Sequence, residues 1–338
     1  MAVRLAVVGA TGAVGELIRS VILEYQIPFE SIIFLASARS AGKSIEWNGK
    51  TYHIEPISPE KFRDVNLVLS STPSSVSKEF SPVAAAAGAI VVDNSSAWRM
   101  DPQVPLVVPE VNSHELANIP KRIIANPNCV AIPLTVALNP LRAIAPIQRV
   151  VVSTYQSSSG KGAKGLADFE AQVEPWAQNQ PVPAPTSHKA QLAGNVITLD
   201  WTLDANGYTE EENKVIAETC KILNQPELKI SPTCVRVPVK ISHSISANVE
   251  FSTPVSAEKA KEILAAAPGV VLLDEWRGEF PQPLLATGSD ATFVGRVRHD
   301  PGNPNALNLW IVADNLRKGA ASNAVQIAKK LIQMGLVG

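Results

Sequence analysis

A cysteine in the first half of the chain has the surroundings of a catalytic nucleophile. Cys129 ends the segment Asn126-Pro127-Asn128-Cys129, which follows a stretch of the length of a dinucleotide-binding fold. A thiolate at this place could attack a carbonyl carbon and hold the product as a thioester while a hydride is transferred. A buried structural cysteine is the alternative, and the residue type alone does not exclude it.

Three residues after Cys129 have types that could serve this thiol. Gln156 ends a predicted strand, where its amide could hydrogen-bond a carbonyl oxygen or an intermediate. Arg236 could pair two N–H groups with a carboxylate. His243 titrates near neutrality and could pass a proton to and from an oxygen of the intermediate. A satisfied core histidine and a surface arginine remain the structural alternatives.

Further charged residues could bind an anionic amino acid. Glu211 and Lys214 are spaced i, i+3 near the start of a predicted helix, where they suit an amino group and a phosphate respectively. That helix opens with the capping-box pattern of residues 209–212. Arg99 follows a predicted strand at 90–92 and could hold an anion. A solvated ion pair and a surface arginine are the alternatives.

A glycine-rich turn follows the first predicted strand, residues 3–8. It reads Gly9-Ala-Thr-Gly-Ala-Val-Gly15 and leads into a helical pattern. Strand, glycine turn and helix in this order are the context of a dinucleotide-binding fingerprint, since glycines let main-chain N–H groups approach a pyrophosphate. The spacing G-x-x-G-x-x-G differs from the usual G-x-G-x-x-G, so a βα turn without a ligand remains possible.

The end of the second predicted strand, residues 31–36, favours NADP over NAD. NAD-binding folds usually carry an acidic residue there for the ribose 2′-hydroxyl. This chain instead has Arg39 and Ser40 within Ser37-Ala-Arg-Ser-Ala-Gly-Lys43. A guanidinium beside hydroxyl groups suits a 2′-phosphate. An ordinary basic surface loop is the alternative.

The alternation of strands and helices predicts an α/β fold with two domains. Residues 1–131 are expected to form a Rossmann-like, doubly wound parallel sheet, with the C-terminal segment 316–338 packing back on it. Residues 132–315 are expected to form an α+β domain. In its helix after residue 209, the apolar stripe Val215, Ile216, Thr219, Cys220, Leu223 places Cys220 in the core.

Composition narrows the class of protein. The chain has 338 residues and a net charge of −1 without basic clusters, so binding to nucleic acid or a membrane surface is not expected. Cys129, Cys220 and Cys234 read as reduced thiols, and the five histidines show no metal-ligand spacing. With neither a leader nor a membrane span in the pattern, a soluble cytoplasmic enzyme without a metal is expected.

Short motifs along almost the whole chain are similar to those of the bacterial aspartate-β-semialdehyde dehydrogenase family. They are Gly9-Ala-Thr-Gly-Ala-Val-Gly15, Ser37-Ala-Arg-Ser-Ala-Gly-Lys43, Val92-Asp-Asn-Ser-Ser-Ala-Trp-Arg-Met100, Pro105-Leu-Val-Val-Pro-Glu-Val-Asn112, Asn126-Pro-Asn-Cys129, Ser153-Thr-Tyr-Gln156, Gly207-Tyr-Thr-Glu-Glu-Glu-Asn-Lys214, Arg236-Val-Pro-Val239 with His243-Ser244, and Asp314-Asn-Leu-Arg-Lys-Gly-Ala-Ala321. So many motifs in the right order are not expected by chance.

The resemblance implies a reaction and a role for each matching residue. Aspartyl-β-phosphate would be reduced to aspartate-β-semialdehyde with NADPH, reversibly and through an acyl-thioester, in lysine, threonine and methionine synthesis. It implies these catalytic residues: Cys129, His243, Gln156. It implies these substrate-binding residues: Arg99, Asn128, Glu211, Lys214, Arg236. It implies these NADP-binding residues: Gly9, Thr11, Gly12, Ala13, Val14, Gly15, Arg39, Ser40, Ser159, Gly160, Asn315. A homodimer or a dimer of dimers is implied, with the second domain, catalytic and dimerising, at the interface.

Two positions depart from the family pattern, and two other functions stay open. Val130 stands where a Ser or Thr usually follows the nucleophile, and Lys161 and Lys164 add cations after Gln156 that could affect the thiol pKa or phosphate affinity. A reductase of another acyl phosphate, such as N-acetylglutamyl phosphate, is one alternative. Glu211 and Arg236 argue against this alternative, because they suit a free amino acid whose amino group is unblocked. A nucleotide-binding regulatory paralogue without turnover is the other.

Overall fold

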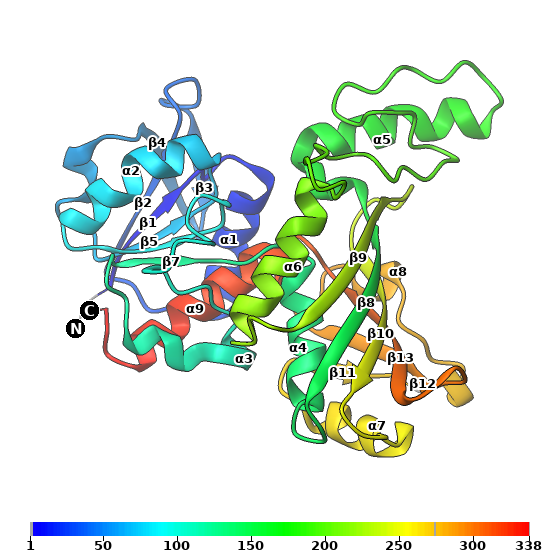
Figure 1. Ribbon diagram of the computed structural model, residues 1–338. Helices are drawn as coiled ribbons and strands as arrows, with labels where there is room; N and C mark the ends of the chain where they lie inside the picture. Colours follow the sequence, from blue (N-terminus) through cyan, green and yellow to red (C-terminus); the bar gives the residue numbers. More distant parts are fainter. Residues whose placement is uncertain (1–2, 274, 338) are drawn as a thin grey trace. The chain divides into compact units, whose positions relative to one another are not determined.

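The chain divides into two compact units. The computed structural model describes residues 3–273 and 275–337. Unit 1 comprises Met1–Pro127 with Ala320–Gly338, and unit 2 comprises Asn128–Gly319 (Figure 1). The division thus falls just before Asn128, so Cys129 belongs to unit 2, whereas the sequence suggested a boundary after residue 131. The assignment of NADP binding and catalysis to the two parts stays a prediction.

Unit 1 is built on a seven-stranded sheet in the order β3-β4-β2-β1-β5-β6-β7. Its strands are β1 (Arg4–Val8), β2 (Ser31–Ala36), β3 (Ser44–Trp47), β4 (Lys50–Pro56), β5 (Leu67–Ser70), β6 (Ile90–Asp93) and β7 (Ile123–Ala125). All neighbouring pairs are parallel except β3 and β4. The predicted Rossmann-like parallel sheet is therefore confirmed.

The β3–β4 hairpin was not foreseen from the sequence. Asn48 and Gly49 join the two strands, and both have positive φ, at 50° and 71°. An Asn-Gly pair in this conformation gives the twist that a two-residue hairpin needs. Strand β4 pairs with β2, so the hairpin extends the parallel sheet beyond β2 and forms its edge.

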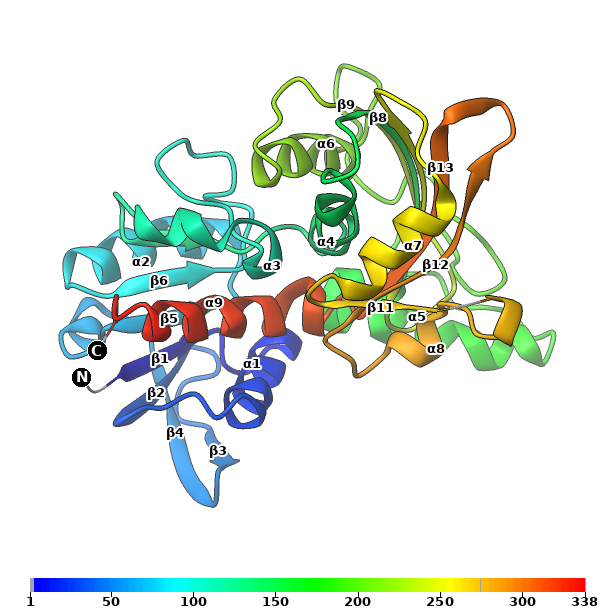
Figure 2. The same ribbon diagram turned by 90° about the horizontal axis from the view of Figure 1, so that it is seen from below.

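The helices of unit 1 include the predicted C-terminal one. They are α1 (Ala13–Glu24), α2 (Ser74–Ala86), α3 (Pro109–Asn112) and α9 (Ser322–Gln333), with short 3₁₀ turns at η1 (Pro59–Phe62) and η2 (Ser113–Ala117). Helix α9 contacts α1, β5 and β6 (Figure 2). Its residues Ala324, Ile327 and Leu331 are fully buried in the core of unit 1. The C-terminal helix therefore packs within unit 1.

Unit 2 is built on a six-stranded mixed sheet in the order β11-β12-β13-β10-β8-β9. Its strands are β8 (Ile147–Gln156), β9 (Lys229–Arg236), β10 (His243–Phe251), β11 (Val270–Leu272), β12 (Thr292–Asp300) and β13 (Asn303–Ala313). β8 with β9 and β11 with β12 are parallel pairs, and the other pairs are antiparallel. This confirms the expected α+β architecture. Strand β12, whose second half carries the exposed Arg296 and Arg298, was not foreseen from the sequence.

Unit 2 also contains five described helices. They are α4 (Ala131–Leu141), α5 (Gly162–Ala177), α6 (Glu210–Ile222), α7 (Ala257–Ala266) and α8 (Pro283–Ala286), with 3₁₀ turns η3 (Ser158–Lys161) and η4 (Glu275–Arg277) and a π-helical turn η5 (Arg317–Ala321). Helix α4 contacts α6, α7, β12 and β13 (Figure 1). Since almost every residue of α4 is buried, this helix, which follows Cys129 and Val130, is fixed in the centre of the unit.

Helix α6 begins as predicted but is rotated from the expected face. The capping box is present: Glu212 N–H donates to Thr209 Oγ1 at 3.3 Å, and Thr209 N–H donates to Glu212 Oε2 at 2.7 Å. Cys220, however, is only half-buried, so its placement in the core is wrong. The helix turns Glu211 and Glu218 inward instead, because both carboxylates accept buried hydrogen bonds.

Among the described residues, none of the helices combines the length and the apolar composition that crossing a bilayer requires.

Candidate active site

Cys129 lies on a tight turn at the start of α4, and Asn128 shapes that turn. Asn128 Oδ1 accepts the N–H groups of Val130 at 2.8 Å and Ala131 at 3.3 Å, as an N-terminal cap does. The N–H of Asn128 donates to Glu218 Oε2 at 2.6 Å. The thiol therefore stands at the positive end of a buried helix, a position that favours a thiolate.

Gly319 lies directly against this turn. A Cβ built on Gly319 would lie 2.9 Å from Cβ of Cys129, closer than side chains come in proteins. The Val130 side chain is fully buried, so the position without the family's usual hydroxyl is filled by an apolar group. The close approach of Gly319 and the burial of Val130 both restrict the main chain at Cys129.

Glu211 joins the thiol turn to Gln156. Its Oε1 accepts the Nδ2–H of Asn128 at 3.0 Å and the Nε2–H of Gln156 at 3.1 Å. Glu211, Asn128 and Gln156 are all buried. Their hydrogen bonds bring α6, the start of α4 and the end of β8 to one place.

The strand order of unit 2 explains why the other predicted residues meet there. In the parallel pair of β8 and β9, Gln156 is the register partner of Arg236. In the antiparallel pair of β8 and β10, Ser244 is the partner of Tyr155, so His243 lies at the same end of the sheet. Gln156 thus stands beside Arg236 and His243, which come from a distant part of the sequence, at the ends of adjacent strands.

His243 is buried and held in one orientation. Ser157 donates its main-chain N–H to Nδ1 of His243 at 3.0 Å, and the Ser157 hydroxyl lies 3.0 Å from the same atom. Burial lowers the pKa of His243 well below its ordinary value, and the nearby Arg236 cation lowers it further. Because Nδ1 accepts an N–H, we assign the ring proton to Nε2. Nε2 is buried and has no hydrogen-bond partner within the described part of the chain.

Arg236 is a buried arginine with a carboxylate partner that sequence analysis missed. Its Nε–H donates to Asp200 Oδ2 at 2.9 Å, and its Nη1–H donates to the carbonyl of Ser157 at 2.6 Å. The guanidinium also lies 4.6 Å from the ring centre of Trp201. The surface-arginine alternative is therefore wrong.

The segment after β8 surrounds Arg236, His243 and Asn315. A Cβ on Gly160 would lie 2.8 Å from Nη1 of Arg236 and 3.3 Å from Nε2 of His243, so the glycine allows close approach. Asn315 Oδ1 accepts from the hydroxyls of Ser157 at 3.1 Å and Ser159 at 3.0 Å. The Asn315 side-chain N–H groups have no hydrogen-bond partner among residues 3–273 and 275–337 and are available to a ligand.

Two lysines have carboxylate partners. Lys214 pairs with Glu210, one turn earlier in α6, at 2.5 Å. Lys161 donates to Asp200 Oδ1 at 2.9 Å and to the carbonyl of Ser187 at 2.7 Å. Its charge is therefore compensated locally, while Lys164 is exposed.

In unit 1, the glycine turn fits the close approach of a dinucleotide. Gly9 has φ +83°, and a Cβ there would lie 2.1 Å from the carbonyl oxygen of Ser71. A Cβ on Gly15 would lie 2.2 Å from the carbonyl oxygen of Gly9. Gly12 caps α1 through its main chain, with no side chain over the helix N-terminus. The first turn of α1, beginning with Ala13 and Val14, therefore offers main-chain N–H groups to an anion.

The candidate 2′-phosphate residues follow β2 beside this turn. Arg39 is exposed, and Ser40 is half-buried. Thr11 Oγ1 donates to Ser40 Oγ at 3.5 Å, which connects the glycine turn with the end of β2. A cation and two hydroxyls near the N-terminus of α1 fit a phosphorylated ribose.

Arg99 is half-buried in unit 1 and is held by main-chain carbonyls. Its Nε–H donates to the carbonyl of Asn126 at 3.0 Å, and its Nη2–H donates to that of Asn94 at 2.8 Å. These carbonyl acceptors orient the guanidinium, and its charge also acts on the buried carboxyl group of Asp93. Within the described residues, no group of three or more His, Cys, Asp or Glu side chains could hold a metal ion.

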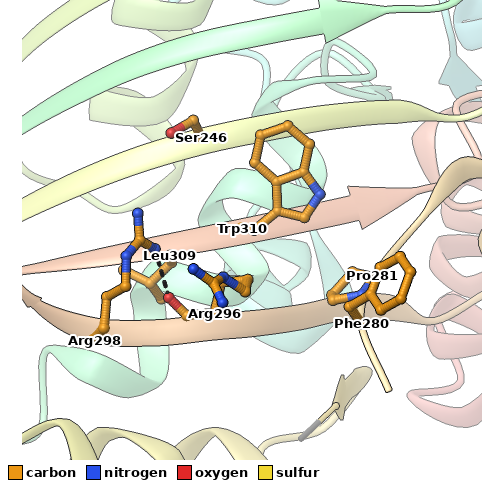
Figure 3. A pocket seen from close by; sticks show the side chains of 7 residues that line it. All are labelled: Ser246, Phe280, Pro281, Arg296, Arg298, Leu309 and Trp310. Atoms are coloured by element: carbon orange, nitrogen blue, oxygen red, sulfur yellow. Dashed lines mark hydrogen bonds between the residues drawn. The ribbon is translucent and has the colours of Figure 1, made fainter. Parts of the chain in front are cut away.

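Unit 2 also contains a pocket lined by residues other than those of the candidate active site. This hollow of about 250 Å³ is bordered by Trp310, Arg296 and Arg298 on β12 and β13, Ser246 on β10, and Phe280, Pro281 and Leu309 (Figure 3). None of the residues that border it was predicted to touch a substrate or nucleotide. It belongs to a part of the sheet that the candidate active site does not use.

Sequence reasoning missed two buried hydrogen-bond acceptors, Glu218 and Asp200. Glu218 and Asp200 each accept hydrogen bonds from residues that carry the predicted chemistry or lie next to them. For Glu218, the inward spacing of Glu211 and Glu218, two helical turns apart, was an available signal. Asp200 lies in an irregular segment, where no periodicity points to its side chain.

Comparisons with known proteins match both units. Residues 4–119 match the family model of the semialdehyde dehydrogenase NAD binding domain, and residues 138–318 match that of the semialdehyde dehydrogenase dimerisation domain. The aspartate-semialdehyde dehydrogenase of Aquifex aeolicus is 45% identical over 340 aligned positions, which cover 100% of both chains.

Solved structures agree with the sequence matches. Aspartate semialdehyde dehydrogenase II of Vibrio cholerae, complexed with ASA, superposes with a TM-score of 0.95 at 40% identity and covers 98% of this chain and 99% of its own. The aspartate semialdehyde dehydrogenase of Candida albicans, solved with NADP, has a TM-score of 0.76 at 25% identity, with coverages of 98% and 99%.

Proposed function

The chain belongs to the aspartate-semialdehyde dehydrogenase family, and we propose that it carries out the family's reaction through a thioester on Cys129, with NADP as its nucleotide. The enzyme interconverts aspartyl phosphate and aspartate semialdehyde, a step of aspartate-family amino-acid biosynthesis. In the proposal this step supplies lysine, by way of diaminopimelate, and threonine and methionine. The observation that carries the proposal is that Gln156, Arg236 and His243 meet at adjacent strand ends beside the Cys129 turn.

Cys129 is the proposed nucleophile. Its position at the start of α4 favours the thiolate, which attacks the acyl carbon of aspartyl phosphate. The new bond joins Sγ to that carbon, and the bond from the carbon to the phosphate oxygen breaks, so phosphate leaves and a thioester remains. Gln156 holds the intermediate in this proposal, supported by the hydrogen bond that fixes its amide on Glu211.

His243 is the proposed donor to the reacting oxygen. Its Nε2–H would stabilise the negative charge that develops on the carbonyl oxygen during attack and again during reduction. When bound, NADPH supplies the hydride for the reduction of the thioester. Expulsion of the Cys129 thiolate then gives the aldehyde without a proton on the oxygen, so a neutral His243 that donates a hydrogen bond suffices. Proton exchange by His243 would require protonation at Nδ1, where Ser157 N–H now donates.

The substrate groups have separate proposed partners. Arg236 binds the α-carboxylate, and Glu211 binds the amino group. The second oxygen of the Glu211 carboxylate supports this, since Asn128 and Gln156 both use the first. Asn128 contributes by orienting Glu211 and Cys129. Arg99 and Lys214 bind phosphate in the proposal, and Lys214 would have to leave Glu210 to do so.

The residues proposed to bind the nucleotide fall into three groups. The main chain of the turn from Gly9 to Gly15, including Thr11, Gly12, Ala13 and Val14, holds the pyrophosphate. Arg39 and Ser40 bind the 2′-phosphate. Gly160 and the Nδ2–H group of Asn315 hold the nicotinamide end, and Ser159 supports Asn315 through its hydroxyl.

We also propose a homodimer, alone or as a dimer of dimers, in the cytoplasm. Residues 138–318 match a dimerisation domain, and the face of the unit 2 sheet that carries Trp310 and Arg298 is hollow and partly apolar (Figure 3). A reducing compartment is proposed because Cys129 has to remain a thiol. Sedimentation at several concentrations measures the oligomeric state.

The direct test is the reverse reaction with purified protein. Aspartate semialdehyde should reduce NADP only when phosphate or arsenate is present, read as NADPH absorbance. Cys129→Ala should have no turnover, whereas Cys220→Ala, in a half-buried cysteine outside the site, should keep it. Wild-type protein that binds NADP without turnover would overturn the proposal.

A further inference from the structure

Asp200 is a buried carboxylate shared by three cationic or polar side chains. Its side chain is fully buried, and it accepts from Arg236 Nε, His188 Nδ1 and Lys161 Nζ, each at 2.9 Å. The N–H of Lys189 adds a fourth hydrogen bond at 3.0 Å. Burial opposes its charge, but these hydrogen bonds more than offset that effect and hold the pKa of Asp200 well below its ordinary value. Asp200 is therefore a fixed anion.

The main chain places this anion beside Arg236. Ile197 forms an antiparallel bridge with Arg236 at the end of β9, with N–H···O distances of 2.8 and 2.9 Å in the two directions. The segment that follows carries Asp200 and Trp201 back over the guanidinium. The carboxylate takes Nε–H, while the ring of Trp201 lies at 4.6 Å from the guanidinium carbon.

The contacts with Asp200 and Ser157 determine which N–H groups of the Arg236 guanidinium remain available to a substrate. An arginine has N–H donors on Nε, Nη1 and Nη2 in a rigid plane. Asp200 uses Nε–H and the carbonyl of Ser157 uses one N–H of Nη1. Within the part of the chain that the structure describes, no hydrogen-bond partner occupies Nη2. The remaining N–H groups of Nη1 and Nη2 form the fork that binds a carboxylate with two parallel hydrogen bonds.

Asp200 itself is prevented from turning. His188 and Lys161 each hold one of its oxygens, and His188 is fixed in turn because Asp168 accepts its main-chain N–H at 3.2 Å. Asp168 also accepts from Thr186 and Ser187 and so orders the loop that carries His188. The orientation of Arg236 thus rests on a network of buried, mutually oriented groups.

We propose that Asp200 is a positioning residue for substrate recognition: it fixes the plane of Arg236 so that the fork of Nη1 and Nη2 faces the α-carboxylate of the substrate. The inference rests on the proposed carboxylate-binding role of Arg236. Asp200 does not touch the substrate in this account. Its effect should therefore depend on the presence of a carboxylate in the substrate.

The test compares two aldehydes in wild type and Asp200→Asn. Asparagine keeps the shape of the side chain but replaces one acceptor oxygen with a donor and removes the charge. We expect the KM for aspartate semialdehyde to rise roughly 10- to 100-fold, as for the loss of a charge-assisted hydrogen bond, with the KM for phosphate and NADP unchanged. With 3-aminopropanal, which lacks the carboxylate, wild type and variant should have equal kcat/KM.

Two further variants separate positioning from stability. Asp200→Glu keeps the charge and should have a KM between those of wild type and Asp200→Asn. Asp168→Asn makes the same chemical change in another buried carboxylate, and it should lower the melting temperature with a smaller change in KM.

The outcomes are distinct. Equal KM values in wild type and both Asp200 variants overturn the inference, as does an equal loss of kcat/KM for both aldehydes in Asp200→Asn. Failure of both variants to fold would assign Asp200 to stability alone. If wild type does not prefer aspartate semialdehyde to 3-aminopropanal, the role of Arg236 fails first. If wild type has no turnover, the proposed function fails, independently of Asp200.

Discussion

The main-chain N–H of Ser157 donates to Nδ1 of His243 at 3.0 Å, so the imidazole presents its Nε2–H. A side-chain substitution at Ser157 cannot remove this main-chain donor. The bond opposes protonation of the ring at Nδ1, and burial and the Arg236 cation act in the same direction. His243 is therefore suited to donate a hydrogen bond over the whole neutral range.

The first prediction concerns pH. The pKa of His243 is lowered in the folded protein, so between that pKa and the ordinary value near 6.5 the unfolded chain binds a proton that the folded chain does not. The free energy of unfolding should therefore fall as the pH falls below about 6.5, by up to about 1.4 kcal/mol per pH unit from this residue. Denaturant unfolding at several pH values measures the slope.

His243→Gln is the matched variant for this slope. It lacks the titrating ring, so the difference in unfolding free energy between the two proteins should shrink or reverse as the pH falls from 6.5. A constant difference across that range would show that His243 has the same pKa in the folded and unfolded states, contrary to the account.

The second prediction concerns Glu211. Glu211→Gln keeps an oxygen that can accept from Asn128 and Gln156. It should leave the melting temperature nearly unchanged but raise the KM for aspartate semialdehyde about 10-fold or more, because a charged partner of the amino group is lost. Glu211→Ala leaves two buried donors unsatisfied and should also destabilise the protein by about 1–3 kcal/mol or more. Equal KM values in Glu211→Gln and wild type would remove Glu211 from substrate binding.

The third prediction compares two glycines of the unit 1 turn. Gly9→Ala forces a side chain into φ +83° and against the Ser71 carbonyl, so it should cost about 1–3 kcal/mol from backbone strain alone and weaken NADP binding. Gly12→Ala meets no atom closer than 3.6 Å, so it should fold normally. Thermal unfolding and NADP titration measure both. Equal stability of the two variants would contradict the tight turn.

The fourth prediction concerns the nucleotide. Arg39→Ala should reduce the preference for NADP over NAD, measured as the ratio of kcat/KM values, by about 10-fold or more, since a charge-assisted contact to phosphate is lost. Lys43→Ala removes a neighbouring exposed cation and serves as the control. If both substitutions change the ratio equally, a general positive potential and not Arg39 determines the preference.

Sequence reasoning identified the residues that we propose to react, but it missed the residues that orient them. Cys129, Gln156 and His243 have side chains whose chemistry is evident from their type, and the strand pattern placed Gln156 at the end of a strand. The register of β8, β9 and β10 then brings them together. Asp200 has no such signal, because Lys161 and Arg236 lie 39 and 36 residues away along the chain. The bridge between Ile197 and Arg236 brings the segment of Asp200 next to Arg236.

The same limit applied to parts of the fold. Helix α6 was predicted from its capping box, but its rotation follows from hydrogen bonds of Glu218 and Glu211 to Asn128, which periodicity of apolar residues does not reveal. The face of α6 with Cys220 therefore lies partly open. The paired strands β3 and β4 were missed although Asn48-Gly49 is a strong hairpin signal.

The central claim is that Cys129 carries the acyl group. Wild-type enzyme mixed with aspartate semialdehyde and NADP, without phosphate, should form one NADPH per active site and gain the mass of one aspartyl group on the peptide that contains Cys129. Added phosphate should release it as aspartyl phosphate. Cys129→Ala should show neither the burst nor the mass gain. An acyl group on Cys220 or Cys234, or a full burst in Cys129→Ala, would contradict the account.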